Sequence, residues 1–507
     1  MRHLSPLLLA LLLCGCSHDN TPPASDAASD AATDAATDSL HPGGDAASDT
    51  ATHADAIAET RNDTLGVDLI IADAFIDPGT PIAVDGLFDD WAGIATRAVD
   101  PEGDATGAFD LTRVYAVSRG TTVFLRFSHG AAKNLNSGPD TEGTLAIEMK
   151  VQNASSLKID LRARTISRDG SSSHPLRWSE VSYRAMPTAA ARESELRIDL
   201  ATIGATVGSD VTIRFSGSDM LTAPVSLRLN LPAQPTQRRD PKRSSEAAFR
   251  VLTLNTYEDG LDDSLRLPTF TRLFSSIDAD IVCLQEETYT TSQTIMSAFP
   301  PAGAGQSWNI LRSGTRDTAI VSRWPLIALP GGSRFVGAGI DLPSGEALVV
   351  YSFHPNCCGY IGSDEDTWRI AQSQELADAI ARVRRGALGV SYTRFANAPV
   401  IIGGDWNLVG SNEPLLRLTT NDGPALTHWL LRHLVGDDIY TWRSDTSRYP
   451  PGMLDLVLFD ATQLTRDKGF IFDSNQLDGA RLLEMGLEKD DSAVTDHLAL
   501  VTDFRLP

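Results

Sequence analysis

A series of short, nearly continuous apolar runs after about Phe249 constrains the fold of this chain more than any other feature. The runs are Val251–Leu254, Ile281–Leu284, Ala319–Val321, Leu348–Tyr351, Val400–Ile402, Leu454–Leu458 and Leu498–Val501. Runs of this length without polar alternation are typical of strands that are buried on both faces. Helices must then cover the sheets, and the spacing of apolar residues predicts one over 367–385. The sequence therefore predicts an α+β fold for this part of the chain.

Polar residues stand directly beside several of these runs. They are Asn255, Gln285-Glu286, His354, Asp405 with Asn407, and Asp496-His497. A strand end is a place where a rigid sheet can hold a polar group at the rim of the core. Taken singly, such a glutamate is usually solvated and such a histidine is usually structural. Together they predict one converging site.

Seven short motifs carry these residues in a fixed order. They are Leu254-Asn255, Leu284-Gln285-Glu286, Ala319-Ile320-Val321-Ser322-Arg323, Ser352-Phe353-His354, Gly404-Asp405-Trp406-Asn407, Leu454-Asp455-Leu456-Val457 and Thr495-Asp496-His497. Residues 248–507 thereby resemble the endonuclease/exonuclease/phosphatase superfamily, which implies a four-layer α/β/β/α sandwich. Two positions depart from some members: Tyr257 replaces an acid, and His354 stands where abasic-site endonucleases have tyrosine. The similarity is therefore nearer the deoxyribonuclease and phosphatase branches.

The resemblance also implies a role for each polar residue. Glu286 is implied as the principal metal ligand, with Asn255 and Asp496 close to the metal shell. Oxygen donors without cysteine favour a hard cation, Mg²⁺ first and Mn²⁺ or Ca²⁺ next. Asp405 is implied to orient or deprotonate the attacking water, and Asn407 to fix its geometry.

Two histidines complete the implied site. His354 and His497 would donate hydrogen bonds to the phosphate oxygens, and Asp455 would hold His497 in the right tautomer. A strand-end cap is the alternative role for Asp455. Glu287 adjoins Glu286 but points to the opposite face if the strand continues, so it is left outside the site.

The implied function is a Mg²⁺-dependent phosphoesterase that hydrolyses a phosphodiester or a phosphomonoester. A nuclease for extracellular or periplasmic DNA or RNA is the first alternative, and cleavage of a phospholipid head group or an inositol phosphate is another. The formal charge of -23 weighs against tight duplex binding, because such binding depends on lysine and arginine. Arg312, Arg316 and Arg334 are candidate phosphate contacts. A catalytically silent surface-binding lipoprotein is the alternative outside the enzymes.

Residues 66–230 alternate apolar and polar side chains in run after run, as in Val123, Leu125 and Phe127. This two-residue period predicts an antiparallel β-sandwich. The segment Ile82–Trp91 resembles the start of family 9 carbohydrate-binding-like modules, so carbohydrate or another surface ligand is a possible partner. Core packing is the favoured role of Trp91. The acids of these loops are candidate Ca²⁺ ligands, although loop carboxylates are more often solvated; they are Asp85, Asp89, Asp90, Asp100 and Asp104.

The first residues predict export. Residues 1–15 resemble a bacterial lipoprotein signal peptide, which implies lipidation of Cys16 and a membrane anchor. An Ala/Asp/Ser/Thr tract over 16–65 predicts a disordered tether. The expected location is the bacterial cell envelope, in the outer membrane on its periplasmic or surface face. Residues 231–247 are polar and basic, which predicts a linker.

Overall fold

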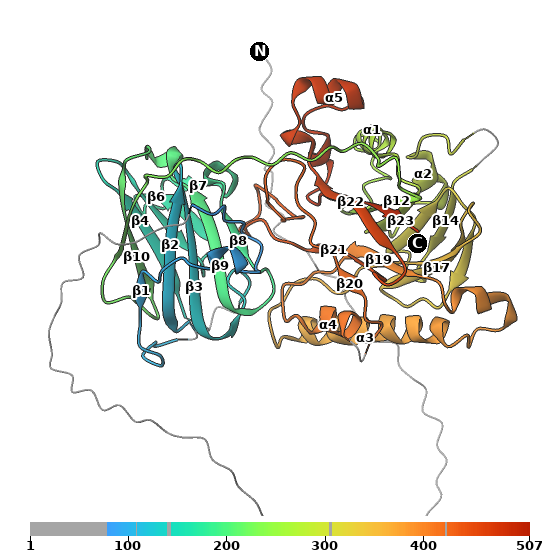
Figure 1. Cartoon of the computed structure of the whole chain (residues 1–507), viewed down its shortest axis with the longest axis horizontal. Helices are drawn as coiled ribbons and strands as arrows, with labels where there is room; N and C mark the ends of the chain where they lie inside the picture. Colours follow the sequence, from blue (N-terminus) through green and yellow to red (C-terminus); the bar gives the residue numbers. More distant parts are fainter. Residues whose placement is uncertain (1–78, 108, 139–142, 304–306, 421–422, 507) are drawn as a thin grey trace, which may run out of the picture. The chain divides into compact units, whose positions relative to one another are not determined.

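The computed structural model describes residues 79–506 apart from 108, 139–142, 304–306 and 421–422. The expected signal peptide, Cys16 and the tether lie outside the described residues. Within the described ranges, no helix is both long and apolar enough to cross a membrane. The fold is mixed α+β with several sheets (Figure 1).

The N-terminal region is rich in β-structure and forms two sheets in which all strand pairs are antiparallel. The first sheet has the order β1 (Ala98–Val99), β2 (Leu111–Arg119), β3 (Thr122–Lys133), β9 (Ala191–Asp199), β8 (Arg184–Met186). The second has the order β11 (Val225–Arg228), β10 (Asp210–Gly217), β4 (Leu145–Val151), β5 (Ser156–Asp160), β6 (Thr165–Arg168), β7 (Pro175–Leu176). Alternate side chains from both sheets share one core, including Leu125 and Leu196 from the first and Ile147 and Ile213 from the second.

Trp91 ends a short 3₁₀ turn, Asp89–Trp91, and is buried. Its indole Nε1 donates to Glu195 Oε2 at 2.7 Å, and the backbone N–H groups of Asp85 and Gly86 donate to Glu195 Oε1 at 2.7 and 2.6 Å. Burial raises the pKa of Glu195 to about 7. Trp91 is therefore a core residue, as predicted.

The C-terminal part contains two six-stranded mixed sheets. The first has the order β14 (Asn309–Arg312), β15 (Thr318–Ser322), β13 (Ile281–Gln285), β12 (Phe249–Asn255), β23 (Ala499–Arg505), β22 (Thr465–Phe472). The second has the order β16 (Leu326–Leu329), β17 (Phe335–Asp341), β18 (Ala347–Phe353), β19 (Val400–Asp405), β21 (Asp455–Phe459), β20 (Thr427–His428). Each apolar run found in the sequence lies in one of these strands or starts one residue before it.

Apolar side chains join the two C-terminal sheets and their helices. Val251 and Ile281 of the first sheet share a core cluster with Val350 and Ile401 of the second. Alternate strand residues face outward, and those of the first sheet pack on α1 (Leu267–Ile277). Those of the second sheet pack on α3 (Asp364–Arg384), which lies on the other side of the strands from α1 (Figure 1). Shorter helices are α2 (Ser292–Ser297), α4 (Glu413–Thr419) and α5 (Gly479–Met485).

Helix α3 begins three residues before the predicted start. The Ser363 side chain accepts a hydrogen bond from the backbone N–H of Asp366, and the acids Asp364, Glu365 and Asp366 fill the first turn. This capping satisfies free backbone donors and favours negative charge at the helix N-terminus. Apolar spacing alone could not locate this start, because the first turn is polar.

Ion pairs connect the N-terminal strands with the C-terminal part. Asp438 contacts the guanidinium of Arg184 at 3.2 Å and that of Arg197 at 2.9 Å. Burial raises the pKa of Asp438, but the two arginines outweigh it and lower the pKa to about 2. The backbone oxygen of Gly410 accepts hydrogen bonds from the Ala190 N–H and from the Asn134 amide.

Cys283 and Cys358 are free thiols. Cys283 is buried in β13, where burial raises the pKa of its thiol to about 12. It therefore serves as a small apolar core residue, as its position in an apolar run predicted.

Candidate functional site

Strand direction brings the polar residues found in the sequence to one edge. β12 and β13 run parallel, and so do β18 and β19, so Asn255, Glu286, His354 and Asp405 stand at strand ends that face the same way. β21 and β23 run antiparallel to β19 and β12, so their first residues return to that edge. The register pairs Asp405 directly with Asp455. The convergence follows from topology, because the end of one strand meets the start of its antiparallel neighbour.

Gly404 permits the close approach of β18 and β19. A Cβ atom at this position would lie 1.9 Å from the backbone oxygen of Phe353. No side chain fits in that space, so glycine is required one residue before Asp405.

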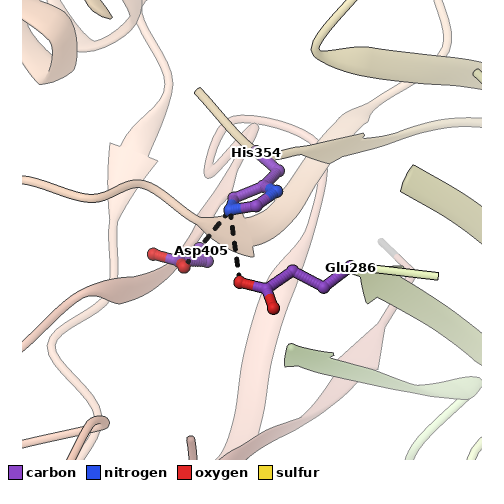
Figure 2. Close-up of side chains that lie close together, drawn as sticks. All are labelled: Glu286, His354 and Asp405. Carbon is purple, nitrogen blue, oxygen red and sulfur yellow. Dashed lines mark ion pairs between the residues drawn. The ribbon is translucent and has the colours of Figure 1, made fainter. Parts of the chain in front are cut away.

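Glu286, His354 and Asp405 form one half of the site (Figure 2). His354 Nε2 lies 3.9 Å from Glu286 Oε1 and 3.6 Å from Asp405 Oδ2. His354 and Asp405 are buried, whereas the Glu286 side chain keeps 27% of its surface exposed. The imidazole thus points between two carboxylates at the accessible end of the site.

His497, Asp455 and Asp496 form the other half. His497 Nδ1 lies 2.8 Å from Asp455 Oδ2, and its Nε2 lies 3.7 Å from Asp405 Oδ2 and 4.0 Å from Asp496 Oδ1. Trp442 Nε1 donates to Asp496 Oδ2 at 2.8 Å. Asp405 therefore lies between the Nε2 atoms of two histidines, one from each half.

Two asparagines hold these carboxylates. The Asn255 Nδ2 amide donates to Glu286 Oε1 at 2.8 Å and to Asp405 Oδ2 at 3.1 Å, and its Oδ1 accepts from the Tyr257 N–H. In this orientation the amide supplies N–H groups to the centre of the site. The Asn407 backbone N–H donates to Asp405 Oδ1 at 3.0 Å, and its side chain donates to Pro355 O.

The backbone is strained around Glu286. Glu286 has φ 64°, and Tyr257, Glu258 and Asp259 have consecutive positive φ values of 58°, 47° and 55°. The Glu258 N–H donates to Glu286 Oε2 at 2.9 Å, and the Asp259 N–H donates to Glu286 O at 2.8 Å. Such strain concentrates at functional sites, where neighbouring structure maintains it. Here it fixes the direction of one carboxylate.

Burial and charge oppose each other at the two histidines. Burial lowers the pKa of His354, but Asp317, Asp405 and Glu286 outweigh it and raise the pKa to about 10. Burial likewise lowers the pKa of His497, but Asp455 and Asp405 raise it to about 10. The neighbouring acids therefore favour the protonated form of both rings, in which Nε2–H is a donor toward the site.

Among the acids, burial raises the pKa of Asp405 to about 6, against the lowering effect of His497. Burial also raises the pKa of Glu286, but His354 and Asn255 outweigh it, so the net shift is downward. Glu286 is the more firmly ionised of the two.

The donor set fits a hard cation. Asp496 Oδ1 is buried and has no hydrogen-bond partner among the described residues. Burial raises the pKa of Asp496, and the negative charge of nearby Glu286 also raises it. A buried carboxylate oxygen without a partner has lone pairs available for an ion. The carboxylates of Glu286 and Asp405 also offer one oxygen each within 4.8 Å of one another. Carboxylate oxygens of this kind suit Mg²⁺, Mn²⁺ or Ca²⁺.

Asp317 is the residue that sequence reasoning missed. Its Oδ2 lies 2.7 Å from His354 Nδ1, so it stands to His354 as Asp455 stands to His497. A signal was available, because Asp317 directly precedes β15, just as Asp496-His497 precedes β23. The pairing itself joins two loops that are distant in sequence.

Two further residues have structural contacts. Glu287 is buried away from the site and accepts from the Leu261 N–H at 3.0 Å. Arg312, a candidate phosphate contact, donates to the backbone oxygens of Thr290, Glu287 and Arg316. Its guanidinium therefore orders the loop that carries Glu286.

One family model matches this part of the chain. Residues 252–497 match the model of the Endonuclease/Exonuclease/phosphatase family. No curated protein matches the chain.

Three solved structures illustrate what this chain is similar to. The human Nocturnin catalytic domain with bound sulfate is 17% identical, with 51% of this chain and 93% of that one covered and a TM-score of 0.36. The D. rerio TDP2 structure with single-strand DNA product is 18% identical, with 51% and 98% covered and a TM-score of 0.33. The AP endonuclease of Leishmania major is 10% identical, with 51% and 88% covered and a TM-score of 0.34.

The matched residues contain the whole converging set, from Asn255 to His497. The family model thus supports an endonuclease/exonuclease/phosphatase domain in the C-terminal half of the chain, and with it a phosphoric ester hydrolase, either a phosphoesterase or a nuclease.

Proposed function

We propose that this protein is a Mg²⁺-dependent phosphoesterase that hydrolyses a phosphodiester, or a phosphomonoester, by attack of water on phosphorus. One observation carries the proposal: the Nε2 atoms of two histidines and three carboxylates, Glu286, Asp405 and Asp496, converge at one strand edge. Cationic N–H donors beside a cation site are what a phosphate with growing negative charge requires.

Glu286 and Asp496 are the residues that would hold the cation, with Asn255 orienting Glu286 through its Nδ2 amide. When bound, Mg²⁺ supplies positive charge that polarises the phosphoryl oxygen. Mn²⁺ or Ca²⁺ would be alternative ions, since all the donors are oxygen atoms. Asp496 Oδ1, which is buried and accepts no hydrogen bond among the described residues, supports this assignment.

Asp405 is the proposed base. Burial raises its pKa to about 6, so it is ionised at neutral pH yet still able to accept a proton from water. The Asn407 N–H and the Asn255 amide hold its two oxygens in place. The base is therefore oriented before the substrate arrives.

His354 and His497 are the proposed donors to the non-bridging phosphate oxygens. Asp317 and Asp455 each accept from the Nδ1 side of one ring, which directs the Nε2–H of both rings toward Asp405 and the site. Loss of one such donor typically costs about 10²–10³ in turnover.

The experiment is hydrolysis of a chromogenic phosphodiester by the full-length chain, with Mg²⁺, with chelator, and with Glu286→Gln and Asp405→Asn. We expect the chelator and both variants to reduce turnover by about 10² or more. Asp341→Asn is the matched control, because Asp341 is exposed, pairs with Arg394 at 2.7 Å, and lies at the opposite end of β17 and β18 from His354. Equal traces from all samples would instead support the silent scaffold.

The natural substrate is tested by a side-by-side panel of DNA, RNA, sphingomyelin and inositol phosphates. Preference for a nucleic acid would select the nuclease alternative within the same fold. The acidic charge of the chain favours a small or lipid-derived phosphate ester over duplex DNA.

The finer architecture and the location belong to the same proposal. We infer a four-layer α/β/β/α arrangement for 248–507 and a β-sandwich for 66–230 that takes a carbohydrate or another surface ligand. Lipidation of Cys16 would anchor the chain in a bacterial envelope membrane through the tether 16–65, with 231–247 as the linker between domains. Radiolabelled palmitate incorporation that Cys16→Ser abolishes is the expected result, and unchanged labelling would contradict it.

A further inference from the structure

Three acids from different segments meet at one end of the N-terminal sheets. Asp100 follows β1, Asp104 lies in the next loop, and Asp219 follows β10. Each offers a carboxylate oxygen, and these oxygens lie within 4.8 Å of one another. Because β1 and β10 belong to different sheets, the cluster connects the two sheets that share the N-terminal core.

The negative charge of this cluster is concentrated and largely buried. Asp100 and Asp219 are each 6% exposed, and Asp104 is exposed. In the described ranges, none of the ion pairs to lysine or arginine involves these three acids. Carboxylates this close repel one another unless a positive charge or a proton lies between them.

The two buried acids of the cluster differ in their hydrogen bonds. Asp219 is oriented by the Leu111 N–H, which donates to its Oδ2 at 2.5 Å, and by the Met220 N–H, which donates to its Oδ1 at 2.7 Å. Asp100 Oδ2, in contrast, is buried and has no hydrogen-bond partner in the described part of the chain. A buried charged oxygen without a partner requires an explanation, and an ion is the direct one among acids.

We infer that Asp100, Asp104 and Asp219 bind a Ca²⁺ ion that links the two N-terminal sheets. Ca²⁺ takes six to eight oxygens at about 2.3–2.6 Å, so ligands on opposite sides of it stand about 4.6–5.2 Å apart. Oxygens within 4.8 Å of one another can share one Ca²⁺ ion, which tolerates irregular ligand geometry better than Mg²⁺ does. The ion would join the end of β1 to the end of β10, and backbone oxygens or water would complete its shell.

The fold separates these residues from the other acids of the same loops. Asp85 contacts Arg432 at 2.6 Å, and Asp90 accepts from the Ala83 N–H at 2.5 Å. Asp85 therefore has a cationic partner, and Asp90 lies outside the cluster. Asp219, which is distant in sequence, takes their place in the cluster.

The test is calorimetric titration of Ca²⁺ into the full-length chain carrying Glu286→Gln, which removes the main ligand of the proposed catalytic cation. We expect about one Ca²⁺ per chain, weakened at least tenfold by Asp100→Asn and by Asp104→Asn. Glu102→Gln is the matched control, because it removes one exposed charge from the same loop and should retain binding.

Thermal unfolding separates a binding role from a folding defect. Ca²⁺ should raise the unfolding temperature of the Glu286→Gln chain by several degrees and leave that of its Asp100→Asn derivative unchanged. In EGTA, Asp100→Asn should unfold at the same temperature or higher, because it relieves repulsion between like charges. Absence of Ca²⁺ binding, or equal binding by Asp100→Asn and Asp104→Asn, would overturn the site. Neither result depends on phosphoesterase activity.

Discussion

The replacement Asp317→Asn tests the electrostatics of the site most directly. The amide oxygen of asparagine can still accept from the His354 Nδ1–H at the position of Asp317 Oδ2, 2.7 Å away. The ring orientation is then kept while the negative charge is lost. The variant therefore separates the charge of Asp317 from its hydrogen bond.

The magnitude follows from the pKa of His354. A rise from 6.5 to about 10 corresponds to about 5 kcal/mol in favour of the protonated ring. Burial opposes this rise, and of the three carboxylates that produce it, Asp317, Asp405 and Glu286, Asp317 contributes first. Four contributions raise this pKa, because Asp317 acts through both its charge and its hydrogen bond, and its charge is the largest of them. The largest of four is at least a quarter of their sum, so removing the charge alone should lower the pKa of His354 by about 1.

The sign of the pH effect is set by the raised pKa. The protonated ring is present below its pKa and is lost as pH rises through it, so Asp317→Asn should lose the donor at a lower pH than the unmodified protein. We expect the alkaline limit of kcat/KM to move down by about one pH unit or more, with little loss near pH 6. A bound cation lowers both pKa values but keeps their order.

Two assays check this result. The first is the pH profile of phosphodiester hydrolysis with saturating Mg²⁺, with Asp341→Asn as the control for removing an acid. The second is NMR titration of the His354 ring, assigned by His354→Asn, which needs no activity. An unchanged pKa of His354, or a loss of rate that is uniform across pH, would refute the reasoning.

Three further predictions concern the cation, the ion pairs and acid stability. Asp496→Asn should raise the Mg²⁺ concentration needed for half-maximal rate, because it removes negative charge from the proposed cation site. An unchanged Mg²⁺ dependence would count against Asp496 as a ligand. The buried Arg250 guanidinium lies 2.6 Å from Asp503 Oδ1. Asp503→Asn should lower the free energy of urea unfolding by about 3–5 kcal/mol, because it leaves the buried charge of Arg250 without its counter-charge. The double change Arg250→Met/Asp503→Leu should recover most of that loss. Because the pKa of Asp438 is lowered to about 2, its ionised form contributes stability above about pH 4, and this stability is lost as pH falls toward 2. Asp438→Asn should therefore lower the free energy of unfolding by about 2 kcal/mol at pH 7 and reduce its dependence on pH between about 4 and 2. The same pH dependence in the variant and the unmodified protein would refute the pairing with Arg184 and Arg197.

The strands were predictable from local pattern. Buried strands such as β12 and β19 are continuous apolar runs, and β3 and β4 alternate with a two-residue period, because a strand exposes successive side chains to opposite faces. Helix α3 was predicted from apolar spacing, but its start was not, because a polar capping turn has no apolar period. Strand existence is thus a short-range property of the chain.

The candidate site divides in the same way. Glu286, His354, Asp405 and His497 each adjoin an apolar run, so the sequence alone identified them as strand-end polar residues. It could not identify the pairing of Asp317 with His354 or the amide nitrogen that Asn255 directs at two carboxylates, since both depend on how distant loops meet.

The acids of the N-terminal loops show why local sequence could not predict such contacts. Composition marks Asp85, Asp90, Asp100 and Asp104 as equivalent loop carboxylates. Tertiary structure places arginine beside the first and a backbone N–H beside the second, and brings Asp219 from another sheet to the remaining pair. The strand pattern depends on neighbouring residues, so the sequence alone determines it. The charge environment of a carboxylate depends on the groups that the tertiary structure places within a few ångströms of it, and no local pattern contains that information.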